Sequence, residues 1–310
     1  MKYHSFIVMM KHWLSGFILL TAFSAIAETN APPRGGPPLG WSTSVRGGSV
    51  YNFETDMDGG GNFSLHRYSV DAGLAYLFKA DRMISLSVGY GLDDYDFSGV
   101  ERQPWNNIEN YRVSSFTRWA LDEEWSLFAI PSVRSYGEKG SSFDDTLTGA
   151  FIGGASYKFS DRLTLGPGFA VAGQIEDDAR YFPVLLLDWK ITERLSLGTG
   201  SGGASSSGPG LTLSYTASKQ WIYELSARYE RRRFRLDKNN RFAPGGVGED
   251  RNIPITGSIT YQLYPGTSLS GIIGSSFGGR LRVEDRSGNK LRSEDYDPAA
   301  FAGLILKIRM

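Results

Sequence analysis

The chain has 310 residues, and 33 lysine and arginine residues balance 33 aspartate and glutamate residues, so the formal net charge is zero. A neutral chain lacks the positive charge that supplies general affinity for nucleic acid, which argues against a nucleic-acid-binding protein. The absence of cysteine excludes disulfides, thiolate zinc sites and cysteine nucleophiles, and three histidines in all leave little for a metal site. We therefore expect no metal centre and no cofactor.

The first 27 residues have the three parts of a secretory signal peptide. Lys2 and Lys11 supply a basic region, residues 13–23 are almost uninterruptedly apolar, and Ala25-Ile26-Ala27 offers small residues at a cleavage position. The apolar run is shorter than the ~20 residues of a membrane-spanning helix. We predict a signal peptide over residues 1–27 with cleavage after Ala27, and therefore an exported protein.

Residues 28–40 are rich in proline and glycine, which disfavours a helix or a central strand. We interpret them as an extended periplasmic lead-in to one domain over residues 41–310. Removal of the signal peptide takes away His4 and His12, so His66 is the one histidine left in the mature chain.

From Trp41 to the last residue the sequence alternates with period two, which is typical of strands with one apolar face. Tyr68, Val70, Leu74, Tyr76 and Phe78, for example, alternate with small or polar residues. Six short charged turns separate such segments, beginning at Asp81, Asp122, Asp161, Glu193, Lys219 and Pro265. Longer polar connections lie between them, at residues 54–62, 93–107, 136–145, 176–178, 200–208, 236–251 and 278–297.

Six turns that alternate with seven longer loops predict seven hairpins, which is the arrangement of a bacterial transmembrane barrel. Large aromatic residues beside the short turns suit an interfacial girdle: Phe78, Trp119, Trp125, Phe159, Trp189, Trp221, Tyr261 and Tyr264. We predict an all-β fold, a transmembrane antiparallel up-and-down β-barrel of about 14 strands, with 12 or 16 as alternatives because some strands alternate imperfectly. A soluble β-sandwich is the less favoured alternative, because it has no reason to collect aromatics beside one set of turns.

The last strand has one apolar face, formed by Ala302, Leu304, Leu306, Ile308 and Met310. It resembles the C-terminal signal that the outer-membrane assembly machinery recognises, although such signals usually end in phenylalanine or tryptophan. The expected location is thus the outer membrane of a Gram-negative bacterium, with membrane lipid, lipopolysaccharide and the assembly machinery as partners.

Three segments carry a resemblance to a family: Trp125–Leu127 with residues 130–134, residues 161–168, and residues 183–189. With these motifs the chain resembles the uncharacterised outer-membrane barrel family catalogued as domain of unknown function 6268, over roughly residues 41–310. The resemblance implies a fold and a compartment, and it brings no catalytic or binding residues.

Basic residues outnumber acidic ones at the positions predicted to face the lumen. We expect Arg118, Arg134, Arg228 and Arg232 to line it and to favour anions if it is open. Alternation turns Arg231, Arg233 and Arg235 outward, where guanidinium groups would meet lipopolysaccharide phosphates. A solvated strand end is the plain alternative for this arginine run.

The leading functional prediction is a porin-like passive channel for small hydrophilic, anionic solutes. A closed structural or surface-interaction barrel is the alternative, because the charged lumen residues would also pair across a packed interior. A lipid-acting enzyme ranks third. It would depend on His66, which shares a strand face with Ser64, so we expect a protein that is not an enzyme.

Overall fold

The computed structural model describes residues 39–199 and 209–310. The predicted signal peptide and residues 28–38 of the predicted lead-in lie outside the described residues. No helix in the described ranges is long and apolar enough to cross a membrane.

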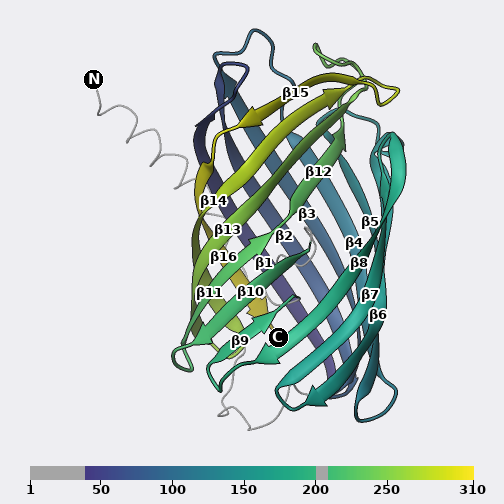
Figure 1. The fold of residues 1–310 in the computed structure, drawn as a ribbon, viewed down its shortest axis with the longest axis vertical. Helices are drawn as coiled ribbons and strands as arrows, with labels where there is room; N and C mark the ends of the chain where they lie inside the picture. The colour runs from purple at the N-terminus through teal and green to yellow at the C-terminus, as the bar shows by residue number, and fades with distance from the viewer. Residues whose placement is uncertain (1–38, 200–208) are drawn as a thin grey trace, which may run out of the picture. The chain divides into compact units, whose positions relative to one another are not determined.

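Antiparallel strands make up nearly all of the described chain (Figure 1). In chain order the elements are β1 (Gly40–Asp56), β2 (Asn62–Lys79), β3 (Arg82–Ser98), β4 (Ile108–Ala120), β5 (Trp125–Glu138), the 3-10 turn η1 (Asp144–Thr146), β6 (Leu147–Ser160), β7 (Leu163–Gln174), β8 (Asp177–Lys190), β9 (Leu195–Gly198), β10 (Gly210–Thr216), β11 (Trp221–Arg228), β12 (Glu230–Arg235), β13 (Val247–Tyr264), β14 (Thr267–Glu284), β15 (Lys290–Tyr296) and β16 (Ala299–Arg309).

The sheet closes on itself as a barrel. β1 to β11 pair in chain order, β11 pairs with β13, β13 with β14 and β14 with β16, and β1 pairs with β16 to join the two ends. β12 continues β11 beyond Tyr229, and β15 and β16 both pair with β14 as two parts of one interrupted strand. The described residues therefore form a closed antiparallel barrel of 14 strands, which confirms the predicted fold class.

The two ends of the barrel differ. One end, the turn end, holds the start of β1, the end of β16 and the six short turns, all at the positions predicted from the sequence. The other end, the loop end, holds the longer connections and lies at the top of Figure 1, where β15 is labelled.

Strands reach further into the loop end than the sequence pattern predicted. β3 continues to Ser98 through a segment expected to be loop, and β13 already begins at Val247. The reason is that the polarity of the two strand faces is exchanged here, so that the apolar side chains point into the barrel and the polar ones point outward. In β3, Tyr95 and Phe97 are buried while Asp94 and Asp96 face outward and are exposed.

The outer surface is apolar over the middle of the wall, where Val70, Leu86 and Val88 remain about half exposed. Beside the turn end, the aromatic girdle predicted from the sequence is present. Phe78 and Trp119 pack together with ring centroids 6.0 Å apart, and Trp221 packs against Tyr261 at 4.7 Å. Apolar and aromatic side chains left on the outside are stabilised by lipid, because water would disfavour so large an apolar surface.

Candidate functional site

Within residues 39–199 and 209–310, one segment of the chain crosses the interior of the barrel. β11 lies in the wall between β10 and β13, but its continuation β12 keeps only its pairing with β13. At its end, Arg235 forms a parallel bridge with Gly137 of β5. Because the wall neighbours of β5 are β4 and β6, β12 must leave the wall and run through the lumen. We call residues 230–246, which comprise β12 and the loop after it, the plug.

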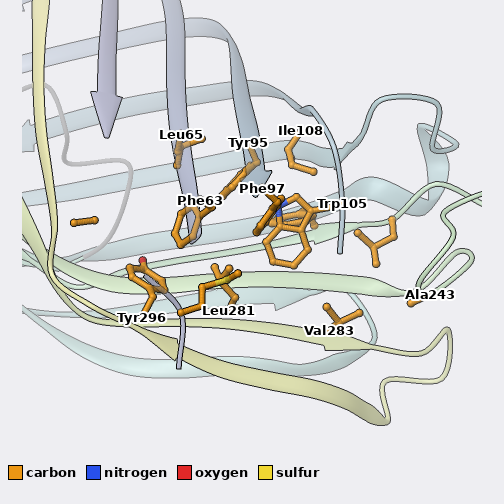
Figure 2. Close-up of a cluster of buried hydrophobic side chains, with 14 residues drawn as sticks. Phe63, Leu65, Tyr95, Phe97, Trp105, Ile108, Ala243, Leu281, Val283 and Tyr296 are labelled. Atoms are coloured by element: carbon orange, nitrogen blue, oxygen red, sulfur yellow. The ribbon is translucent and has the colours of Figure 1, made fainter. Parts of the chain in front are cut away.

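An apolar cluster surrounds the plug at the loop end (Figure 2). Trp105 is fully buried, with its ring centroid 5.5 Å from Tyr95 and 5.0 Å from Phe234 of the plug. Phe234 fits against β13 only because position 248 is glycine, where a Cβ atom would lie 2.2 Å from the ring. The cluster consists of Met57, Phe63, Leu65, Tyr95, Phe97, Trp105, Ile108, Phe234, Leu236, Ala243, Leu281, Val283, Tyr296 and Ala299. Each large side chain buried here contributes about 1.5–3 kcal/mol, so the plug is firmly seated.

A first ion cluster lies beside the apolar cluster, with Asp250 of β13 at its centre. Asp250 is 1% exposed and accepts hydrogen bonds from the hydroxyls of Tyr95 and Tyr296, each at 2.9 Å. Arg67 of β2 lies 3.5 Å from Asp250 and 3.6 Å from Glu230 of the plug.

Arg232 of the plug completes this first ion cluster. Its guanidinium pairs with Glu230 and lies 4.0 Å from Oδ2 of Asp93, and the Tyr136 hydroxyl donates to the same Asp93 oxygen at 2.8 Å. Three carboxylates, two arginines and three tyrosine hydroxyls thus lie together, and the opposite charges of the carboxylates and guanidinium groups offset the cost of burying them.

A second ion cluster holds the other face of β12, and it corrects the orientation expected for the arginine run. Arg233 pairs with Glu249 and Glu284 and donates to the Ile175 carbonyl at 2.6 Å. Arg231 pairs with Glu249 at 2.6 Å.

Arg235 likewise points into protein, where it pairs with Glu176 and donates to the Gly245 carbonyl at 3.0 Å. The expected outward orientation of Arg231, Arg233 and Arg235 is therefore wrong, because β12 lies inside the barrel with protein on both of its faces. Their guanidinium groups contact protein carboxylates in place of the lipopolysaccharide phosphates expected from the sequence.

Glu138 ties the plug to another loop. It is buried and accepts the backbone N–H groups of Asn106 and Asp237 at 2.9 and 2.8 Å. The side chain of Asn240 bridges the same two loops, since it donates to Glu138 at 2.9 Å and to the Pro104 carbonyl at 3.0 Å.

The turn end contains an open cavity of about 730 Å³. Its lining mixes the two charges, with Arg118, Lys158 and Lys190 near Asp161 and Asp188. The volume is large enough for a small hydrophilic molecule.

A row of basic side chains links the turn end to the loop end along the inner wall. In the strand register Lys307 stands opposite Arg46, Arg46 opposite Asp71, and Arg112 opposite Arg134, while Gly89 lies between Asp71 and Arg112. The row begins near the end of β16 at the turn end and reaches Thr148, next to the start of β6 at the loop end. It climbs because barrel strands tilt against the barrel axis. We call Lys307, Arg46, Arg112 and Arg134 the basic track.

The four arginines predicted to line the lumen lie at different heights along the barrel axis. Arg118 lines the turn-end cavity, Arg134 belongs to the basic track, and Arg228 stands at the end of β11 opposite Gly210 of β10. Arg232 belongs to the plug. Asp250, Tyr95 and Trp105 are functional residues that were not predicted from the sequence, although the inverted alternation around Tyr95 indicates that this part of β3 turns its apolar face inward.

Solved outer-membrane structures share this fold. An outer-membrane channel from Pseudomonas putida F1 matches with a TM-score of 0.51 and 8% identity, over 91% of this chain and 100% of that chain. A Pseudomonas aeruginosa FadL homologue matches at 0.44 and 12% identity, over 87% and 89% of the two chains. The P. putida toluene transporter TodX matches at 0.42 and 9% identity, over 88% and 91%.

No protein-family model matches the chain, and no curated protein matches it. The similarity to the P. putida F1 channel shows the fold alone, because fold is retained long after substrate and activity diverge. The chain is thus a β-barrel of the outer-membrane type.

Proposed function

We propose that the protein is an outer-membrane channel for small hydrophilic, preferentially anionic solutes, and that the plug closes it at rest. The observation that carries the proposal is the basic track, which runs through the lumen from the turn end toward the loop end. Four cations stand in this row with Asp71 between them. A row of cations inside a low-dielectric wall raises the local concentration of anions.

The orientation in the membrane follows from the two ends. In bacterial barrels the short turns face the periplasm and the longer loops face the cell surface. The turn-end cavity would then open to the periplasm, and the plug would close the side that meets lipopolysaccharide. Export by the N-terminal segment, insertion by the assembly machinery and membership of the family catalogued as domain of unknown function 6268 belong to the same proposal.

The plug can move without opening the wall, because it is attached to the wall by a single strand pairing. β12 bonds along its backbone to β13 and touches β5 at one residue pair. Its other attachments are side-chain contacts. Release of these contacts would connect the basic track with the loop end.

Ion conductance in planar lipid bilayers tests the proposal. The wild-type protein should conduct rarely, whereas the variant Phe234→Ala/Leu236→Ala, which removes two buried plug side chains, should give long steady openings with anion preference. The matched control is Tyr223→Ala/Leu225→Ala, two exposed outward residues of β11, which should behave as wild type. Silence of the plug variant, when electrophoretic mobility shows that it is folded, would contradict the channel.

A closed structural or surface-interaction barrel is the second candidate. The observation that favours it is the completeness of the loop-end packing, in which both ion clusters and the apolar cluster fill the interior. A silent but folded plug variant would support this candidate. A large open conductance of the wild-type protein would instead support the channel and contradict the closed plug.

A further inference from the structure

The outer face of β1 and β2 carries a serine, a histidine and a tyrosine in contact. Ser49 stands opposite Tyr68 in the strand register, and Tyr51 opposite His66. Tyr51 and Tyr68 are both more than a third exposed, so this row faces away from the lumen. On the other side of β2, Asp94 of β3 stands opposite His66.

The three side chains form a hydrogen-bonded chain. His66 Nε2 lies 2.9 Å from Ser49 Oγ, and His66 Nδ1 lies 2.7 Å from the hydroxyl of Tyr68. The imidazole packs on the Tyr68 ring with centroids 4.0 Å apart, and the Tyr51 ring stands nearly perpendicular to the imidazole with centroids 5.6 Å apart. The two aromatic rings therefore hold the imidazole in one orientation.

This group lies where the apolar belt of the wall meets its polar rim. Toward the turn end the next outward positions are apolar, with Val70 and Tyr90 paired in the register. Toward the loop end the outward position after Asp94 is Asp96, paired with Ser64. Leu304 of β16 stands beside Ser49. Lipid ester groups occupy this boundary in a bilayer, between the hydrocarbon and the headgroups.

An ionisable side chain on the lipid-facing surface is costly, which makes such a residue a candidate for function. A serine within hydrogen-bond reach of an imidazole, with the imidazole oriented by a third group, is the arrangement of an activated nucleophile. From the sequence, Ser64 is the serine expected on the same strand face as His66. The structure instead brings His66 to Ser49 of the neighbouring strand.

We propose that Ser49 and His66 form a catalytic site that hydrolyses carboxylic esters of membrane lipids. His66 Nε2 takes the proton of Ser49 Oγ, which attacks the ester carbonyl, and the lipid alcohol leaves with the proton from His66. Water then attacks the acyl-serine as His66 accepts its proton, which frees the fatty acid and restores Ser49. Tyr68 is a positioning residue, whose hydroxyl oxygen accepts a hydrogen bond from the Nδ1–H of His66 and so fixes this tautomer. The site is independent of the lumen and of the proposed channel.

The first test is covalent labelling of the detergent-purified, folded full chain with an alkyl fluorophosphonate, followed by mass spectrometry of the adduct. We expect the label on Ser49, at wild-type level in Ser115→Ala and lost in Ser49→Ala. Ser115 is a matched control, because it is a serine of the wall that pairs with the exposed Leu86. Absence of an adduct at Ser49 would overturn the proposal.

The second test measures fatty acid released from phosphatidylethanolamine micelles and, separately, from purified lipopolysaccharide, which distinguishes the two sources of lipid ester. Ser49→Ala and His66→Ala should each lower the rate at least ~100-fold, the usual contribution of a general base. Tyr68→Phe should lower kcat and change its pH profile, because the tautomer is no longer fixed. Equal rates in wild type and Ser49→Ala, or labelling without release from either lipid, would contradict the assignment.

Discussion

Replacement of Asp250 by alanine tests whether the first ion cluster stabilises the closed interior. The substitution leaves the Tyr95 and Tyr296 hydroxyls without the acceptor that each now reaches at 2.9 Å, and it takes from Arg67 a carboxylate at 3.5 Å. Loss of one partner of a buried ion pair costs about 3–5 kcal/mol, and an orphaned buried donor costs about 1–3 kcal/mol. Arg67 keeps Glu230 as a partner, so we expect a loss of about 3–5 kcal/mol in the free energy of unfolding.

Urea titration of the protein in lipid vesicles, followed by tryptophan fluorescence, measures this loss. Asp250→Asn should lose about half as much, because its amide oxygen still accepts one hydroxyl. Asp188→Ala is the control, since that carboxylate is exposed in the turn-end cavity, and it should change stability by less than about 0.5 kcal/mol. If Asp250→Ala were as stable as wild type, the ion cluster would not hold the interior together.

Three further predictions concern the lumen, the plug and the turn end. Arg112→Gln/Arg134→Gln, combined with the plug variant, should lower the anion preference seen in the reversal potential, and an unchanged potential would contradict the role of the basic track. Trp105 is the one described tryptophan out of contact with the outer surface, so its fluorescence should resist aqueous iodide in wild type and become quenchable in the plug variant; equal quenching would mean that the plug stays seated. The backbone N–H groups of Trp125 and Glu124 donate to Asp122 and lower the pKa of its carboxyl. The ionised carboxylate therefore stabilises the folded protein at neutral pH, and this contribution is lost as the pH falls below the usual aspartate range. The urea midpoint of Asp122→Asn should depend less on pH over that range, and an equal pH dependence would contradict this role of Asp122.

The wall of the barrel follows from the sequence, because its signals are local. Alternation over a strand such as residues 68–78 indicates which side chains face lipid, and a turn motif such as Asp122–Glu124 indicates where the chain reverses direction. The girdle, the six turns and the number of strands can be predicted without knowing which strands lie across the lumen from each other. The backbone hydrogen bonds of an up-and-down barrel join neighbours in the chain, so its topology is nearly one-dimensional.

The interior was decided by contacts between residues far apart in the chain. The sequence places Arg232 and Arg233 on opposite faces of a strand, which is correct, but only the tertiary structure shows that both faces are covered by protein. Asp250 meets Tyr95 across 155 residues.

The same distinction applies to the outer face, where Ser49 reaches His66 through the register of β1 and β2. The sequence by itself determined the strands, the turns and the lipid-facing surface, because each depends on residues close together in the chain. The tertiary structure alone decided that β12 lies inside the barrel and which serine meets the histidine. The free energy of those contacts comes from packing and charge compensation between strands that are far apart in the sequence, and a local sequence pattern carries no information about which strands meet.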